Sequence, residues 1–197
     1  TSAAISTAVG NVNTFSGAAT ATLGDNHTLA ELKAINNAIS GNITLNSNAV
    51  ALTGSAADIK AALAGNVGAV YTGDVTINDA NGAGIAAADI STIAGDTTGD
   101  VTVSNNINIT GTSAAISTAV GNVNTFSGAA TATLGDNHTL AELKAINNAI
   151  SGNITLNSNA VALTGSTSDV KAALAGNVGA VYTGDVTLND ANGAGIA

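Results

Sequence analysis

Apolar residues recur along the chain at two spacings, one typical of helices and the other of strands. The helical spacing of three to four residues occurs at Leu29, Leu32, Ile35 and Ile39. Each such segment closes on a glycine that Asn or Asp follows, as expected where a left-handed residue ends a helix. The pattern predicts four helices, over residues 2–10, 28–41, 55–65 and about 86–95.

Short segments between these helices alternate between polar and apolar residues, which is typical of half-buried strands. Thr recurs on one face of these segments, and Val, Ile or Leu recur on the other. Strands are predicted over residues 21–23, 42–45, 74–77 and 100–103, and shorter second strands over 49–52 and 107–110. Two helix starts also carry capping patterns, Thr28 with Glu31 and Ser55 with Asp58.

A long internal repeat organises the chain. Residues 1–86 recur as residues 112–197, 111 positions later. The copies differ only at Ala56/Thr167, Ala57/Ser168, Ile59/Val170 and Ile77/Leu188. Residues 1–111 therefore form one full period, and residues 112–197 form a partial second period that is nearly identical to 1–86. Because the chain stops within a period, we expect it to be a window on a longer array.

The predicted fold class is α/β, a solenoid whose turns hold one short helix and one or two short strands. The closing glycines divide each period into four turns of about 24–31 residues each, a length typical of solenoid repeats. One alternative is a β-solenoid with little helix. An open doubly wound sheet is disfavoured, because near-identical long repeats do not suit a closed domain whose strands all differ in environment. The strand register stays open at this stage.

Composition narrows the possible partners. The 197 residues include 23 Gly, no Pro and no Cys, and the formal net charge is −9 with only four Lys and no Arg. Such an acidic chain lacks the clustered cations that bind nucleic acid or an anionic membrane surface. Small side chains imply a thin core, and the absence of Cys excludes disulfides and thiolate chemistry.

Candidate chemistry is sparse. The G-x-G-x-x-A run at residues 82–87 is interpreted as a small-residue turn, since four residues separate it from the preceding strand and a dinucleotide site needs them adjacent. The turn around Asn78 does not match a helix–loop–helix calcium site, because Ile77 and Ala88 occupy the first and twelfth loop positions. A looser, weak calcium site remains a hypothesis for four turn residues, Asp74, Asp79, Asp96 and Asp100.

The remaining polar residues are given structural interpretations. His27 and His138 precede helices and are expected to be solvated, and Lys33 and Lys60 are expected to face solvent within their own helices. No catalytic residue is assigned. Stacked strands would align threonines into a row, predicted to contain Thr22, Thr44, Thr76 and Thr102 and to continue through Thr133, Thr155 and Thr187. The preferred interpretation of this row is a half-buried strand face.

Two runs, TGDVTVSNNINITG at residues 98–111 and LTGSAADIKAAL at 52–63, resemble a known class of sequence. They are similar to very long, acidic tandem-repeat proteins secreted to the surface of bacteria, particularly cyanobacteria. The resemblance extends over the whole chain and rests on amino-acid composition. It implies an extracellular structural or adhesive role and carries over no catalytic residue.

The sequence thus predicts a structural, non-enzymatic segment of a secreted repeat protein that forms an extracellular fibre, sheath or surface layer. The alternative is a cell-surface adhesin with weak calcium or glycan binding. No cofactor is expected, with calcium the possible exception. The expected partners are further copies, head to tail and laterally into filaments, because both ends of the sequence continue the repeat. Neither nucleic-acid binding nor membrane insertion is expected.

Overall fold

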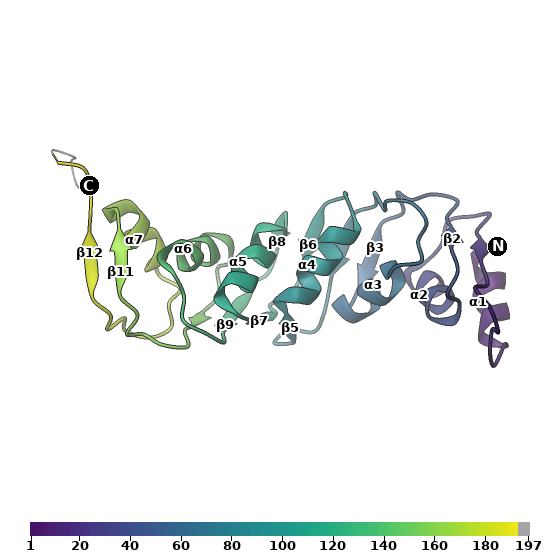
Figure 1. The fold of residues 1–197 in the computed structure, drawn as a ribbon, viewed down its shortest axis with the longest axis horizontal. Helices are drawn as coiled ribbons and strands as arrows, with labels where there is room; N and C mark the ends of the chain where they lie inside the picture. Colours follow the sequence, from purple (N-terminus) through teal and green to yellow (C-terminus); the bar gives the residue numbers. More distant parts are fainter. Residues whose placement is uncertain (193–197) are drawn as a thin grey trace. The chain divides into compact units, whose positions relative to one another are not determined.

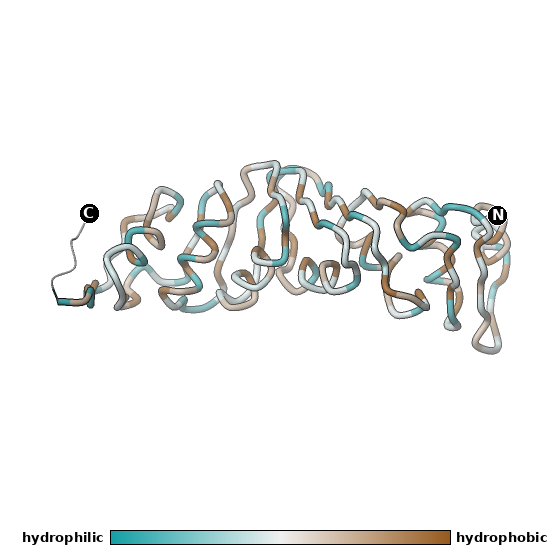
Figure 2. Tube along the Cα trace, turned by 90° about the horizontal axis from the view of Figure 1, so that it is seen from above, coloured by the Kyte–Doolittle hydropathy of each residue, from teal (hydrophilic) through white to brown (hydrophobic). Residues whose placement is uncertain are grey.

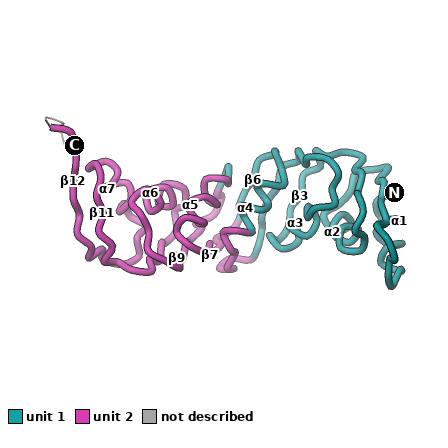
Figure 3. Tube along the Cα trace, viewed as in Figure 1, with its two compact units in different colours: residues 1–79, 89–104, 123–125 teal, residues 80–88, 105–122, 126–197 magenta. Residues whose placement is uncertain are grey.

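The computed structural model describes residues 1–192, and the chain divides into two compact units (Figure 3). Unit 1 comprises Thr1–Asp79, Asp89–Ser104 and Val123–Thr125. Unit 2 comprises Ala80–Ala88, Asn105–Asn122 and the described part of Phe126–Ala197. Both units are α/β and are built from repeated helix–strand segments with parallel sheets (Figure 1).

Seven helices lie within residues 1–192, and the four predicted for the first period are confirmed. Their bounds are α1 Ser2–Gly10, α2 Leu29–Ala38, α3 Ala56–Leu63, α4 Ala87–Asp96, α5 Ser113–Gly121, α6 Leu140–Ala149 and α7 Thr167–Ala173. A β-solenoid with little helix is therefore wrong. Helix α2 stops short of the predicted Gly41, because Ile39 adopts an extended conformation with φ −118° and ψ 152°. In unit 1, α1, α2 and α3 pack one after another, as α5, α6 and α7 do in unit 2 (Figure 1).

Helix starts follow the predicted capping chemistry. Thr28 and Glu31 form a complete capping box at α2, with each side chain bonded to the other residue's backbone amide. The same box recurs at α6. At α3, the Ser55 hydroxyl accepts a hydrogen bond from the Asp58 amide at 3.1 Å. These bonds satisfy amides that no helical carbonyl reaches.

The strands are short, two to four residues each. Their bounds are β1 Ala21–Thr22, β2 Ile43–Thr44, β3 Leu52–Gly54, β4 Val75–Ile77, β5 Gly84–Ala86, β6 Val101–Val103, β7 Asn108–Gly111, β8 Thr125–Phe126, β9 Thr131–Leu134, β10 Ile154–Thr155, β11 Leu163–Gly165 and β12 Val186–Leu188. The second strand predicted over 49–52 lies later, at β3. The sequence interpretation missed β5 and β8, and the helix expected from about residue 86 begins directly after β5.

Parallel pairing joins strands that belong to successive turns of the chain. Ala21 of β1 pairs with Ile43 of β2, and Val75 of β4 pairs with Val101 of β6. The sheet orders are β1-β2, β3-β4-β6-β8, β5-β7-β9-β10 and β11-β12. Each sheet adds strands in chain order, without the reversal that defines a doubly wound sheet.

The core is thin and lies between the helices and the strands. One face of α2 buries Leu32 and Ile35 completely, and the apolar face of the strands buries Ile43 and Val75 completely. Alanines such as Ala62 fill the space where helices pack closely. This small-residue interior explains how a chain with so few large side chains still removes apolar surface from water.

The closing glycines have different roles, which corrects the prediction of a left-handed residue at each of them. Only Gly65 and its counterpart Gly176 adopt that conformation, with φ of 48° and 55°. Gly10 and Gly95 lie inside α1 and α4. Gly41 is needed for close approach, since a Cβ there would clash with the backbone oxygen of Ala19.

Substituting Gly65 by valine should lower the melting temperature of unit 1. No atom lies within 4 Å of a Cβ at this position, so the loss comes from the left-handed backbone alone. We expect a cost of about 1–2 kcal/mol, because a β-branched residue is strained at positive φ. Gly65→Asn, the matched variant, should cost less, since Asn tolerates this conformation. Equal melting temperatures for Gly65→Val and the parent would contradict the assigned helix end.

Hydropathy changes over short distances along the trace, and brown and teal segments alternate within each turn (Figure 2). Among the described residues, no helix combines the length and the apolar character needed to cross a membrane.

Candidate functional site

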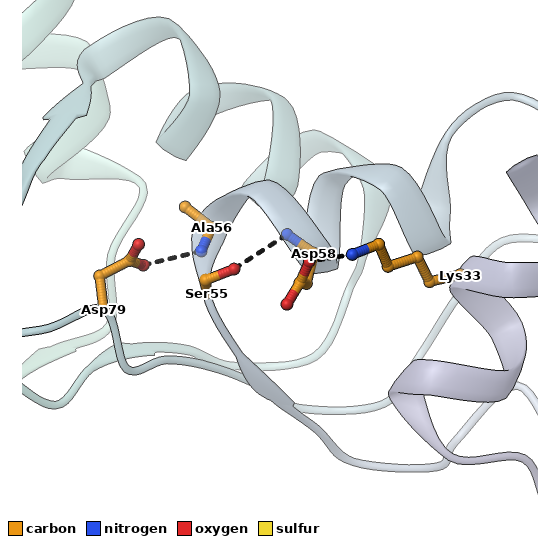
Figure 4. A network of polar contacts seen from close by, with 5 residues as sticks. All are labelled: Lys33, Ser55, Ala56, Asp58 and Asp79. Carbon is orange, nitrogen blue, oxygen red and sulfur yellow. Dashed lines mark hydrogen bonds and ion pairs between the residues drawn. The ribbon is translucent and has the colours of Figure 1, made fainter.

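Polar side chains link successive turns at the helix starts (Figure 4). Asp79 Oδ2 accepts a hydrogen bond from the backbone amide of Ala56, the first residue of α3, at 2.7 Å. On the same helix, Asp58 Oδ1 forms an ion pair with Lys33 Nζ of α2. Helix α3 is therefore joined to the preceding turn through Lys33 and to the following turn through Asp79.

The contact made by Asp79 recurs at alternate helices. In each case an aspartate of the following turn accepts the amide hydrogen of the first helical residue. The pairs are Ser2 with Asp25 at 2.6 Å, Ser113 with Asp136 at 2.7 Å, and Thr167 with Asp190 at 3.0 Å. A carboxylate at a helix N-terminus is favoured by the unbonded amides and by the helix dipole. These aspartates thus bond each helix start to the helix–strand segment that follows it.

Lys33, Lys60 and Lys144 each have a partner on the next helix, so Lys33 and Lys60 do not simply face solvent as expected. Lys60 Nζ forms an ion pair with Asp89 Oδ1, and in unit 2 Lys144 pairs with Asp169 as Lys33 does with Asp58. The charged side chains are about 40% exposed. Water screens each pair, so it contributes little to stability, and its main effect is on the alignment of adjacent helices.

The four calcium candidates do not gather at one place. Asp74 Oδ1 accepts a hydrogen bond from the Asp100 amide at 3.0 Å, so these two lie together before β4 and β6. Asp100 Oδ1 in turn accepts from Asn124 Nδ2 at 2.9 Å. Asp79 lies at the start of α3, and Asp96 ends α4. No group of three His, Cys, Asp or Glu side chains suitable for a metal occurs among residues 1–192.

Asp96 lines a different part of unit 1. A hollow of about 350 Å³ lies between the end of α4 and the segment before β4, and its lining includes Asp96, Gly65 and Tyr71. Burial raises the pKa of Asp96 above its usual value. No second acid lines this hollow, so Asp96 lies apart from the Asp74–Asp100 pair.

The glycine-rich run is part of the strand stack. Gly84 belongs to β5, and Gly82 has φ of 80° and donates its amide hydrogen to the Asn106 carbonyl at 2.6 Å. In return, Asn81 Oδ1 accepts from the Asn106 amide at 3.0 Å. The amide that would contact a phosphate in a dinucleotide site is therefore used to pair neighbouring turns.

Threonine rows are present, but each belongs to its own sheet. The predicted neighbours Thr44 and Thr76 do not pair, because Thr76 lies between Thr53 and Thr102. The observed rows are Thr22–Thr44, Thr53–Thr76–Thr102, Thr110–Thr133–Thr155 and Thr164–Thr187. Thr76 and Thr102 are half-buried, as expected, whereas Thr22 and Thr44 are exposed.

The expectation of a solvated histidine is wrong at both positions. His27 and His138 are each only 3% exposed. The Nε2 atom of His27 lies 3.2 Å from the Tyr71 hydroxyl, and that of His138 lies 3.0 Å from the Tyr182 hydroxyl. Polar neighbours in the sequence suggested solvent. The only sequence signal for this contact is that histidine and tyrosine are equally far apart in both copies.

Sequence reasoning also missed a buried asparagine. Asn36 of α2 donates from Nδ2 to carbonyls at the end of α3, with Ala64 O at 2.7 Å and Ala61 O at 3.0 Å. Asn66, which follows α3, donates to the Ile39 carbonyl at the end of α2 at 2.9 Å. The two side chains satisfy carbonyls that the helices leave unpaired, so adjacent helix ends are joined in both directions.

Acid should weaken the stack. The Ser2 amide lowers the pKa of Asp25, the Lys33 ammonium lowers that of Asp58, and the Thr167 side chain lowers that of Asp190. A carboxyl whose folded-state pKa is depressed adds stability above its unfolded pKa, and that stability is lost as pH falls through the folded value. We expect the contribution of these carboxylates to be lost, and the melting temperature to fall for that reason, once the pH drops below about 4. Circular dichroism melts at pH 5 and pH 2.5 would measure the change.

The control is a variant in which Asp58 and its counterpart Asp169 are both replaced by Asn. It should be less stable at pH 5 and should lose less between pH 5 and pH 2.5, because two of the responsible carboxyls are gone. Equal melting temperatures at pH 5 and pH 2.5 in the parent would contradict a role for these carboxylates.

Comparison with known proteins identified no relative of this chain. No protein-family model, no curated protein and no solved structure matches the chain.

Proposed function

We propose that this chain is a structural segment of a secreted repeat protein, whose turns stack as a solenoid within an extracellular fibre, sheath or surface layer. One observation carries the proposal. Many of the polar side chains that could perform chemistry, among them Asp25, Asp79, Lys33 and Lys60, are bonded to a neighbouring turn. Each of these bonds spans about one turn of the repeat. No catalytic function is assigned.

The strand arrangement supports a solenoid. The pairs within β3-β4-β6 and within β5-β7-β9-β10 are parallel, and the sheets add strands in chain order. Parallel pairing in chain order is what a stack of turns requires, because in repeat proteins each turn contacts mainly its neighbours. The four helices of the first period correspond to four such turns.

The second copy supports extension by further repeats. The ion pair between Lys33 and Asp58 recurs between Lys144 and Asp169, and the buried contact of Asn36 recurs at Asn147. Such repeated contacts let additional periods, or another copy stacked head to tail, add through the same surfaces. Lateral packing is favoured by low charge density, 9% of residues, and by an exposed valine that recurs in both copies. Val70 is 67% exposed and its counterpart Val181 is 84% exposed.

Small-angle X-ray scattering on arrays of one, two and three periods tests the solenoid. The maximum dimension should rise in proportion to the number of periods while the cross-section stays constant. A maximum dimension that grows only as the cube root of mass would overturn the solenoid.

Electron microscopy of native material tests the filament, and dispersed single particles at high concentration would contradict it.

The alternative, an adhesin with weak calcium or glycan binding, has two observations in its favour. One is the Asp74–Asp100 pair. The other is a small hollow of about 120 Å³ beside β2, whose lining includes the uncharged side chains of Asn42, Thr44 and Asn48. A similar hollow of about 130 Å³ occurs in unit 2. Amides and hydroxyls in a concave, uncharged site suit a neutral sugar.

Calcium separates the two functions. In an adhesin, millimolar calcium should raise the melting temperature by several degrees, because a ligand that binds only the folded state stabilises it. A variant with both Asp74→Asn and Asp100→Asn should lose that rise. An unchanged melting temperature in the parent favours the structural function, as does the absence of glycan binding on a sugar array.

A further inference from the structure

A buried histidine–tyrosine contact joins three turns of unit 1. His27 lies in the loop before α2, Val50 lies shortly before β3, and Tyr71 lies shortly before β4. His27 Nε2 is 3.2 Å from the Tyr71 hydroxyl, which donates its hydrogen to the Val50 carbonyl. His27 is 3% exposed and Tyr71 is 1% exposed, so both side chains lie in the interior. The contact therefore links the turn that holds His27 to the turn that holds Tyr71, through the Val50 carbonyl of the turn between them.

The same chain of contacts exists in unit 2. His138 Nε2 is 3.0 Å from the Tyr182 hydroxyl, which donates to the Val161 carbonyl at 2.6 Å. Tyr182 is less buried than Tyr71, whereas His138 is as buried as His27. The geometry thus persists where less of the tyrosine is covered.

The direction of these bonds assigns the histidine tautomer. A carbonyl oxygen only accepts, so the single hydroxyl hydrogen of Tyr71 goes to Val50. The tyrosine oxygen must then accept from His27, which requires a hydrogen on Nε2. The other ring nitrogen, Nδ1, is buried and has no partner in the structure, and the same holds for His138. Adding a proton to Nδ1 would place both a charge and an unbonded N–H in the interior.

We propose that the contacts His27–Tyr71–Val50 and His138–Tyr182–Val161 are proton-sensitive latches, each of which holds three successive turns together while its histidine is neutral and carries its hydrogen on Nε2. Protonation of Nδ1 opens the latch, because the charged ring is stabilised only when the turns separate and water reaches it. The stack therefore responds to mild acid, well before its carboxylates are protonated.

The charged surroundings determine the sign of this response. Burial lowers the pKa of His27 below its usual value, and the Glu31 carboxylate opposes this without reversing it. That carboxylate already accepts hydrogen bonds from the Thr28 amide and the Ser2 hydroxyl. Burial raises the pKa of Tyr71 to about 12, so the tyrosine stays neutral. On the α4 side of Tyr71, Asp96 lines the neighbouring hollow.

His138 behaves in the same way. Burial lowers its pKa, against opposing contributions from Glu142 and Asp136. A histidine whose folded-state pKa lies below the unfolded value of about 6.5 binds more protons when unfolded. Stability is then present above about pH 6.5 and is lost as the pH falls toward the folded-state pKa.

Nuclear magnetic resonance of the imidazole nitrogens tests the tautomer and the titration directly. At pH 7.5, long-range ¹⁵N–¹H spectra should show both histidines as the Nε2–H tautomer. Each should titrate with a midpoint clearly below 6.5. An Nδ1–H tautomer, or a midpoint at 6.5 or above, would overturn the proposal.

The two units supply matched controls within one molecule. Tyr71→Phe removes the acceptor for His27 and leaves His138 untouched, so only the His27 signals should lose their tautomer preference. Tyr182→Phe should have the converse effect. A change in both histidines or in neither would refute the assignment. If Tyr71→Phe prevents unit 1 from folding, the tautomer and titration midpoint of His27 in the parent protein still test the proposal.

Stability supplies the third readout. Between pH 7 and pH 5 the melting temperature of the parent should fall by several degrees. A variant with His27→Gln and His138→Gln should show almost no change over the same range, because glutamine can donate to the tyrosine but does not titrate. An equal fall in both proteins would show that the histidines are not responsible.

Discussion

Replacing Gly99 by alanine should be among the most destabilising single substitutions in unit 1. A Cβ at this position would overlap the carbonyl oxygen of Gly73 and lie 2.8 Å from the Asp74 amide nitrogen. Both neighbours are backbone atoms of the preceding turn, so no side chain can rotate away. Separating the turns would strain the pairing of β4 with β6. We expect a cost of at least about 3 kcal/mol, at the upper end of overpacking effects.

Gly95→Ala is the matched control for Gly99→Ala. Gly95 lies in α4, and no atom comes within 4 Å of a Cβ built there. Alanine should stabilise this helix by about 0.5–1 kcal/mol, because glycine loses more backbone entropy on folding. Thermal melts of the two variants should therefore shift in opposite directions. A Gly99→Ala protein that melts with the parent would show that the turns are not in close contact.

Val75→Ala should cost about 2.5 kcal/mol through lost burial and the cavity left behind. Val75 lies in β4 and is 0% exposed. Val186 occupies the equivalent position in β12 and is 45% exposed. Val186→Ala should therefore cost less than about 1 kcal/mol, since much of its surface already contacts water.

These two substitutions remove the same atoms from the same strand position in the two copies. The difference between their effects measures how much of the burial comes from the turn that follows β4. Chemical denaturation of both variants gives the two free energies. Equal losses would mean that a turn buries its own strand without help from the next.

Local elements could be predicted from the sequence because their determinants lie within a few residues. The side chains of Thr28 and Glu31 cap α2 from positions at the helix start, and α1 has the predicted bounds. Prediction failed at the opposite end of α2. The local pattern predicts that Gly41 ends the helix, whereas a glycine is required there because its backbone closely approaches the carbonyl oxygen of Ala19. Nothing in the local pattern distinguishes these two uses of glycine.

The strand register could not be predicted, because helices and strands repeat at different intervals. The step from the start of α1 to the start of α2 is longer than the step between paired strand residues such as Ala21 and Ile43. A row of threonines therefore cannot continue from one sheet to the next. Thr76 pairs with Thr53 in β3 instead of Thr44 in β2.

The bonding partners of the candidate-site residues could not be predicted from the sequence either. Asp79 in a turn suggests calcium or simple turn chemistry, and only the fold shows its bond to the Ala56 amide. His27 has Asp25 and Asn26 before it in the sequence, which suggests a solvated loop. Tyr71, which buries it, comes from a turn far along the chain.

The capping of one turn by the next has a consequence for how the chain acquires structure during synthesis. The first amides of α1 and α3 are bonded to Asp25 and Asp79, each of which belongs to the turn that follows. The ribosome synthesises the chain from its N-terminus. The first amides of each of these helices therefore have no carboxylate partner until the aspartate has left the ribosome. The delay is the same at both helices, whereas α2 carries its own capping box and does not depend on a later turn for this bond. Thermal fraying would run along the same path in reverse, since loss of a later turn exposes the helix start of the turn before it.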